Sequence, residues 1–575
     1  MGIWDALYNN DIDDTRPLRI SNLFRHPFRD RESGCEDGSD LFDDPPLAMN
    51  ERNMLALSAS LRDQPNWWNK TQDPEACARC KAEAVGAPVP YGDIPLTSDE
   101  VEYVLDEIAW HASQRDSKTG IEASIFERIW QSDHLVDDTT RSGLLHEVAQ
   151  LENVPTDQKD WHPGTDEQVL NLVDPSLYCL DYEETEAWSE YDASPLFPEP
   201  DLDIFDDCQD VGGRFFSLGL SWLPTDFAIS KNASRARAIA YINNLDPHHH
   251  ASAYAIVEQL VARFVPLFER VLTESQVAFG CKLRRFVQGD YWWEDIELDS
   301  EDSGDDDHED VEPGEARTLH LPSVKKFSPY DIRRRHMRLS EQTIQVVIKL
   351  DSVILTPSKP FYAGEQWHVA GMANDGIVAV GMYAYDSHNV TKVGLGFRMA
   401  VVTTSLSYEE GDEEGVKAAY GFAQDDPLNQ QLGVVSMTQG RCVAFPNVYQ
   451  HRREAFELAD KSKPGHCKFM TLFLVDPRLP KLRPSTTDIP PQQPDWMRSL
   501  LQEIATKLRE GSGATGTVTG LGRLPLEILD MIVDEAEWLA TKQEATERRL
   551  QLLDEHEQMR QAWDDALFCI PFVGA

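Results

Sequence analysis

The chain has 575 residues, with 99 acidic and 53 basic side chains, and its formal net charge at pH 7 is −46. Such a charge opposes binding to nucleic acid and to an anionic membrane surface. The nine cysteines are scattered and odd in number, which argues against a disulfide scaffold. The sequence shows no signal segment near its start and no run of about 18 apolar residues that would predict a transmembrane helix. We therefore expect an intracellular protein, cytoplasmic or nuclear.

The first half of the chain is predicted to be irregular and then helical. Residues 1–90 mix proline, glycine and acidic residues without a clear period, which indicates an irregular N-terminal segment. Residues 91–293 are predicted to be mainly helical, because Ser98 begins a stretch with an acidic first turn and residues 251–272 carry apolar side chains at helical spacing. Residues 294–312 hold twelve acidic residues out of nineteen, which predicts a disordered insertion.

The second half is rich in predicted strands. Residues 313–480 contain short runs of β-branched and aromatic residues separated by Gly, Pro, Asn and Asp, which predicts an antiparallel barrel or jelly roll. A Pro- and Gly-rich linker is expected at 481–522 and a helical tail at 523–575. The predicted fold class is α+β, with a double-stranded β-helix (jelly-roll) core between a large helical N-terminal region and a helical C-terminal tail.

Two histidines in the β-rich region are candidate metal ligands. His368 follows "FYAGEQW", and His451 follows a predicted strand that ends in "AFPN". Two His and one carboxylate on a barrel form the facial triad of non-haem iron oxygenases. Ala370 stands two residues after His368, on the same strand face, where a carboxylate would complete such a site. Two His alone are a weak signal, because a buried His satisfied by the backbone is commoner than a ligand.

Longer stretches of the sequence resemble a known family. The segments "WHPGTDEQVLNLVDPSLYCL" (161–180), "LDSVILTPSKPFYAGEQWHVAGMANDGIVAVGMYAYDSHNV" (350–390) and "GRCVAFPNVYQHRREAFELADKSKPGHCKFMTLFLVDP" (440–477) are similar to the fungal family called domain of unknown function 4246, or DUF4246. That family looks like a relative of the 2-oxoglutarate and iron(II) dioxygenase barrels. The resemblance implies Fe(II) and 2-oxoglutarate as cofactors of an active member, with His368 and His451 as metal ligands.

The sequence departs from the family pattern at two functional positions. The family has Glu at the position of Ala370, which would be the iron carboxylate. It has Arg at the position of Cys467, which would pair bidentately with the distal carboxylate of 2-oxoglutarate. Asp375 is a candidate substitute for the metal carboxylate, and Lys468 or Arg452 is a candidate substitute for the cofactor-binding cation.

Three interpretations stay open. In the first, the substitutes complete an Fe(II)- and 2-oxoglutarate-dependent oxygenase that acts on an unknown small-molecule or protein substrate. In the second, Ala370 makes room for an external anion such as chloride, as in the non-haem halogenases. In the third, the chain has lost the chemistry and is a non-catalytic binding or scaffold protein, which binds a partner through its C-terminal helices or acidic insertion. The geometry tests the first interpretation, because such an oxygenase needs both imidazoles and a carboxylate to converge on one point.

Overall fold

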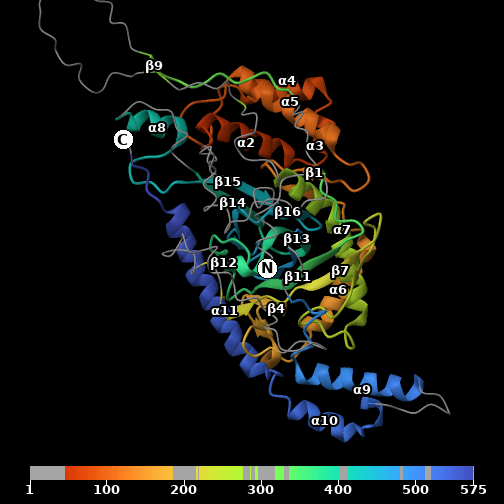
Figure 1. Cartoon of the computed structure of the whole chain (residues 1–575). Coiled ribbons are helices and arrows are strands. Elements are labelled where there is room, and N and C mark those ends of the chain that lie inside the picture. The colour runs from red at the N-terminus through yellow and green to blue at the C-terminus, as the bar shows by residue number, and fades with distance from the viewer. Residues whose placement is uncertain are drawn as a thin grey trace, which may run out of the picture.

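The computed structural model describes residues 46–185, 219–275, 318–328, 336–401, 411–478, 484–511 and 520–573, with residues 215, 217, 285 and 292–294. Antiparallel sheets lie at the centre of the molecule and helices surround them (Figure 1). The α-helices are α2 (Met49–Arg62), α3 (Trp67–Lys70), α4 (Pro74–Ala84), α5 (Ser98–Gln114), α6 (Asp138–Glu152), α7 (Ala251–Ser275), α8 (Glu413–Tyr420), α9 (Pro494–Gly511), α10 (Leu526–Asp534) and α11 (Lys542–Trp563).

The large sheet has the strand order β1-β2-β16-β13-β19-β11-β4-β3, with β7 paired to both β11 and β8. A second sheet has the order β15-β14-β17, and three strand pairs, β12-β18, β5-β6 and β9-β10, complete the set. The strands are β1 (Glu122–Ala123), β2 (Trp130–Ser132), β3 (Asp160–Trp161), β4 (Val169–Val173), β5 (Leu180–Asp181), β6 (Leu220–Ser221), β7 (Thr225–Ile229), β8 (Ala236–Ala238), β9 (Trp292–Glu294), β10 (Thr318–His320), β11 (Thr343–Leu355), β12 (Phe361–Tyr362), β13 (Ile377–His388), β14 (Gly394–Ala400), β15 (Asn429–Ser436), β16 (Cys442–Pro446), β17 (Gln450–Arg453), β18 (Phe456–Glu457) and β19 (Gly465–Val475).

Alternation along β11 divides the core into two layers. Ile344 and Val346 lie in an apolar cluster with Phe264 of α7. Val347 lies in a second cluster, which includes Phe397 of β14. Because successive side chains of a strand point to opposite faces, α7 covers one face of the large sheet and the β14 sheet lies against the other. The interior between the two sheets therefore receives every second residue of β11.

Helix α7 is the main helix of the core. Its length and composition would allow it to cross a membrane, yet half of its most apolar window is buried inside this molecule. It packs closely on β13, where a Cβ added at Gly381 would lie 2.6 Å from Phe264 Cδ1 and 3.0 Å from Phe268 Cζ. The absence of a side chain at Gly381 thus sets how near the helix approaches the sheet.

Gly381→Ala is expected to lower the free energy of unfolding by about 1–3 kcal/mol, because the added methyl must displace two buried rings. Urea unfolding measures this directly. Gly219→Ala is the matched control, since its methyl would meet nothing nearer than Gln551 Nε2 at 4.0 Å. Equal stability of the two variants would contradict the close approach of α7.

The N-terminal part of the chain is more regular than its sequence predicts. Residues 46–90 were expected to be irregular but contain α2, α3 and α4, whereas residues 1–45 lie outside the described residues. The expected helix at Ser98 is confirmed as α5, and Thr97 is its N-cap in a capping box with Glu100. Helix α4 buries none of its side chains, so it lacks the apolar stripe that sequence patterning detects.

The described parts of the region 91–293 contain the helices α5, α6 and α7, together with short strands that the sequence did not predict. Strands β4 and β7 have five residues each and pair with β11, far along the chain. Strands this short are formed by pairing with a partner strand rather than by their own propensity. Most of the acidic stretch 294–312 lies outside the described residues.

The C-terminal part also differs in one respect from expectation. The stretch 481–522 was predicted to be a linker, yet it contains the 18-residue helix α9. The described part of the tail, 523–573, contains α10 and α11, and Figure 1 shows α11, in dark blue, running along the outside of the central sheets. Met559 and Trp563 of α11 are buried in a cluster with Val369 and Met372, the residues just after His368. The tail therefore covers the loop that carries the first candidate ligand.

Candidate functional site

The structure brings His368 and His451 together. Their backbones form an antiparallel bridge, with N···O distances of 2.9 and 3.2 Å, and their ring centroids are 4.5 Å apart. His451 is almost fully buried against Phe445, whereas His368 is only partly buried. The two predicted residues are therefore in contact, at the point where the chain after β12 runs beside β17.

Both imidazoles are neutral at physiological pH. Burial lowers the pKa of His368, although the nearby Glu365 opposes this effect. Burial, together with His368, lowers the pKa of His451 much further. The Nδ1 atom of His368 lies 2.9 Å from the Gln366 carbonyl, which can only accept, so Nδ1 carries the proton and Nε2 is left as an acceptor. A metal-binding His commonly has this arrangement, but so does a structural His.

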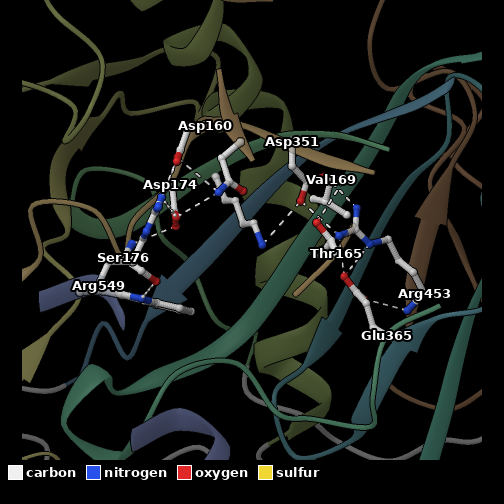
Figure 2. Close-up of polar contacts among 12 residues, drawn as sticks. Asp160, Thr165, Val169, Asp174, Ser176, Asp351, Glu365, Arg453 and Arg549 are labelled. Carbon is white, nitrogen blue, oxygen red and sulfur yellow. Dashed lines mark hydrogen bonds and ion pairs between the residues drawn. The ribbon is translucent and has the colours of Figure 1, made fainter. Parts of the chain in front are cut away.

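A buried ion-pair network lies beside the two histidines. Arg453 Nη1 donates to Asp351 Oδ1 at 2.7 Å, and Arg453 Nε donates to Glu365 Oε1 at 2.7 Å. Lys349 approaches the same Asp351 at 3.6 Å. Figure 2 shows the Arg453 guanidinium between the two carboxylates. The side chains of Arg453 and Asp351 are 4% and 3% exposed, while that of Glu365 is 24% exposed and forms the wetter end of the network.

The charges in this network depend on one another. Burial acts to raise the pKa of Glu365, but Arg453, with help from His368, holds that pKa well below its usual range. Burial opposes the charged form of Arg453, but Asp351 and then Glu365 raise its pKa well above the usual value. The guanidinium and the Glu365 carboxylate are therefore ionised, and Arg453 is already paired with two carboxylates, which leaves this cation little capacity for another anion.

The position at which the sequence comparison expects a metal carboxylate is apolar. Ala370 is buried in the inner apolar cluster. Its backbone is fixed by Asn447, which accepts from the Ala370 N–H and donates to the Ala370 carbonyl, both at 2.8 Å. Asn447 is itself completely buried. Position 370 is thus held firmly by hydrogen bonds, but its side chain offers no ligand.

Asp375 was the expected substitute carboxylate, and the structure gives it another role. Its Oδ1 accepts from the Trp222 N–H at 2.9 Å, and its Oδ2 accepts from the Met372 N–H at 2.7 Å. Oδ2 fixes the turn that precedes β13, and Oδ1 holds the segment of Trp222 against that turn, as expected for a short buried Asp that caps backbone donors. The structure therefore does not bring Asp375 to the His pair as a free ligand.

Lys468 and Arg452, the expected substitutes for the cofactor-binding cation, also have other partners. Lys468 donates to Glu152 of α6 at 2.7 Å, on the face of β19 opposite to Cys467. Arg452 pairs with Glu454 and stacks over Trp367, with its guanidinium carbon 4.3 Å from the ring centroid. Adjacent residues of a strand point to opposite faces, so Lys468 faces away from the side of Cys467, and Arg452 faces away from the side of His451.

A second charged cluster attaches α11 to the large sheet. Arg549 contacts both oxygens of Asp160 at 2.7 Å and Asp174 at 3.4 Å (Figure 2). Two helical turns further on, His556 contacts Trp222 edge-to-face, and burial lowers its pKa to about 4. Its Nε2 has no hydrogen-bond partner within the described part of the chain. His368 also contributes to the lowered pKa of His556, so this part of α11 lies near the histidine pair.

The sequence contains signals for the network that a search for metal ligands misses. Asp351 interrupts an apolar strand, "VVIKLDSVIL", at a position where alternation places it inside. Arg453 is two residues from His451 and so shares its face. Glu365 lies three residues before His368. Among the described residues, no group of three or more His, Cys, Asp or Glu side chains is placed to hold a metal ion.

Comparison with known proteins adds a family but no established activity. A BsmA homologue from Methylobium petroleophilum PM1 is 8% identical, with a TM-score of 0.15, over 24% of this chain and 42% of its own. The Fe(II)/α-ketoglutarate-dependent dioxygenase TqaL is 9% identical, with a TM-score of 0.20, over 61% of this chain and 96% of its own. Likenesses at such TM-scores carry no argument about fold or chemistry, and the first spans less than half of its structure.

No curated protein matches the chain. The family model described as "Domain of unknown function DUF4246, N-terminal" matches residues 7–83. The model described as "Protein of unknown function (DUF4246)" matches residues 98–500, which is well over half of the sequence. The chain belongs to the DUF4246 family.

Proposed function

We propose that this chain is a non-catalytic binding or scaffold protein, built on a jelly-roll core whose metal and co-substrate centre has been replaced by a buried ion-pair network. The observation that carries the proposal is the commitment of Arg453 to Asp351 and Glu365 beside the His pair. An oxygenase needs a free carboxylate for the metal and a free cation for the co-substrate. Here these groups neutralise each other.

The strand connections support the jelly-roll part of the proposal. Strands β11, β13, β16 and β19 lie next to one another in the large sheet in the order β16-β13-β19-β11, while β14, β15 and β17 form the opposing sheet. The His368–His451 bridge extends the opposing sheet on the side of β17. Such alternation of the chain between two antiparallel sheets is typical of a double-stranded β-helix.

Fe(II) and 2-oxoglutarate do not fit the residues present. The third metal position is the methyl group of Ala370, and Asp375 is held by two backbone N–H groups. The position expected to bind the co-substrate carboxylate is Cys467, which is fully buried. Burial raises the pKa of this thiol to about 12, so it stays neutral and offers no charge to an anion. The side chains at these three positions therefore do not support an oxygenase reaction.

One observation favours an enzyme as the second candidate. The proton on His368 Nδ1 leaves its Nε2 available, and His451 lies beside it, so two imidazoles are presented together. In the halogenase interpretation, the metal is held by two His and an external anion. That ligand set does not require Ala370 or Asp375 to bind the metal. A co-substrate anchor is still missing, because Arg453 is already paired.

Anaerobic titration of Fe(II) and then 2-oxoglutarate into the purified protein tests the proposal, with chloride present in one arm. We expect neither the visible absorption of a ternary complex nor conversion of 2-oxoglutarate to succinate after oxygen is admitted. A known 2-oxoglutarate oxygenase run in parallel controls for the reagents. Stoichiometric appearance of the band in this protein, with succinate formation, would overturn the proposal in favour of the enzyme.

The proposal includes a protein partner that binds the C-terminal helices. Helix α11 packs on the core, but α10 exposes four large apolar side chains, between 39% and 57% exposed: Leu526, Ile528, Met531 and Ile532. Exposed apolar residues grouped on one short helix are typical of a protein contact. The anionic surface expected from the composition disfavours nucleic acid and anionic membranes as that partner.

A further inference from the structure

A separate pocket lies between the N-terminal helix α2 and the small sheet. Its volume is about 300 Å³. Helix α2 contributes Arg52 and Arg62, strand β15 contributes residues 432–436, and Lys392 and Arg441 are among the other polar residues of the wall. This volume is at the lower end of the range for small-molecule sites. None of these residues belongs to the His368–His451 neighbourhood.

The pocket is cationic in a strongly anionic chain. Four basic side chains line it, Arg52, Arg62, Lys392 and Arg441, against the single carboxylate of Asp63. Two of the four are neutralised: Lys392 pairs with Asp63 at 2.7 Å, and Arg441 pairs with Asp133 at 2.6 Å. The other two, Arg52 and Arg62, form no ion pair with any carboxylate of the described residues.

Arg62 is the more deeply buried of these two cations, with 6% of its surface exposed. Its two terminal nitrogens donate to the carbonyls of Ser124 and Ala123, which are neutral acceptors. The carboxylates that act on it from further away are already engaged, Glu122 by Arg115 at 3.1 Å and Glu107 by Arg285 at 3.0 Å. A buried guanidinium without a counter-charge is costly, and an anion in the pocket would remove that cost.

Arg52 presents a second guanidinium. It lies over the ring of Tyr91, with its central carbon 3.9 Å from the ring centroid, which fixes its orientation. The Nε atoms of both Arg52 and Arg62 are buried and have no hydrogen-bond partner in the part of the chain that the structure describes. Buried donors of this kind in a native protein normally have a partner, so both guanidinium groups keep capacity for an acceptor.

The wall also has an apolar part, which includes Leu55, Ala59, Phe126 and Val435. We propose that this pocket binds a small organic anion, in which a carboxylate or phosphate group meets Arg52 and Arg62 and an apolar body contacts the remaining wall. Guanidinium groups pair bidentately with both kinds of head group, so the chemistry common to the two is a planar or tetrahedral oxyanion. The site goes beyond the proposed function and does not depend on the state of the histidine pair.

Calorimetric titration of the full-length protein with 2-naphthoate, 2-naphthyl phosphate and the neutral 2-naphthamide tests the site. We expect saturable one-to-one binding of at least one anion, weakened by added NaCl, and at least tenfold weaker binding of the amide. The anion that binds more tightly identifies the head group. Absence of binding by both anions, or equal binding of the amide, would overturn the proposal.

Two variants place the binding in this pocket. Arg52→Gln removes one guanidinium without disturbing the carbonyl contacts of Arg62, and Ala59→Phe fills the volume without changing charge; each is expected to weaken anion binding at least tenfold. Arg263→Gln is the charge-matched control, because this half-exposed arginine of α7 lies outside the pocket wall. Thermal unfolding checks that all variants are folded. Unchanged affinity in both folded pocket variants would show that the anion binds elsewhere.

Discussion

Arg453→Met is expected to lower the free energy of unfolding by about 3–5 kcal/mol at neutral pH, which is the usual cost of removing one partner from a buried ion pair. The substitution keeps a long side chain over Phe469 but leaves Asp351, 3% exposed, without its guanidinium. Lys349 is 3.6 Å from the same carboxylate and compensates only in part. Urea unfolding followed by tryptophan fluorescence measures the change.

The loss should depend on pH in a defined direction. In the native chain Arg453 lowers the pKa of Glu365, so this interaction stabilises the fold above the ordinary glutamate pKa of about 4.3 and is lost as the pH falls through the lower folded value. Without the guanidinium, burial raises that pKa, and protonation relieves the variant as the pH falls. The stability difference between native protein and variant should therefore shrink from pH 7 towards pH 4.

Arg452→Met is the matched control for this result. The neighbouring arginine makes an ion pair of similar length with Glu454, but the two side chains are 31% and 26% exposed. Pairs in contact with solvent contribute about 0–1 kcal/mol, so this variant should be close to native and insensitive to pH. A loss at position 453 no larger than that at position 452 would show that the network is not the structural substitute for a metal centre.

The sequence predicted the elements whose pattern is local. The helices that became α5 and α7 follow from caps and apolar spacing over many residues, and the alternating strand β11 follows from its own thirteen residues. The meeting of His368 with His451 was expected because both lie in a predicted barrel. Strands β4 and β7 could not be predicted from their own residues, because their extended conformation depends on pairing with β11.

The partners of the charged residues were harder to predict. Asp351, Glu365 and Arg453 are separated by up to about a hundred residues, and only the packing of β11 in the large sheet against β17 in the opposing sheet brings them together. Strand alternation could have excluded Lys468 at once, because it faces α6 when Cys467 faces inward. The role of Asp375 as an acceptor for backbone N–H groups depends on the turn before β13, and no periodic pattern in the sequence predicts that turn.

Ala370→Glu is expected to create a metal site and to make stability depend on metal. Ala370 is 3% exposed, so a carboxylate there lacks water and costs at least about 1–3 kcal/mol in the metal-free protein. A divalent ion bound by that carboxylate with His368 and His451 would recover the loss, by about 2.7 kcal/mol at a free concentration one hundred times the Kd. Thermal unfolding with and without Fe(II) under anaerobic conditions measures the recovery.

The control and the second substitution separate metal binding from co-substrate binding. Ala363→Glu adds the same charge at an exposed position of the same loop and should show no metal-dependent shift. Adding Cys467→Arg to Ala370→Glu supplies a second cation near Arg453, which is itself already paired with Asp351 and Glu365. The new guanidinium can bind the distal carboxylate of 2-oxoglutarate, so only this double variant should show the absorption of the complex with Fe(II). A metal shift in the native chain equal to that of Ala370→Glu would mean that two histidines already suffice. The lost carboxylate would then not explain the lack of activity that we propose.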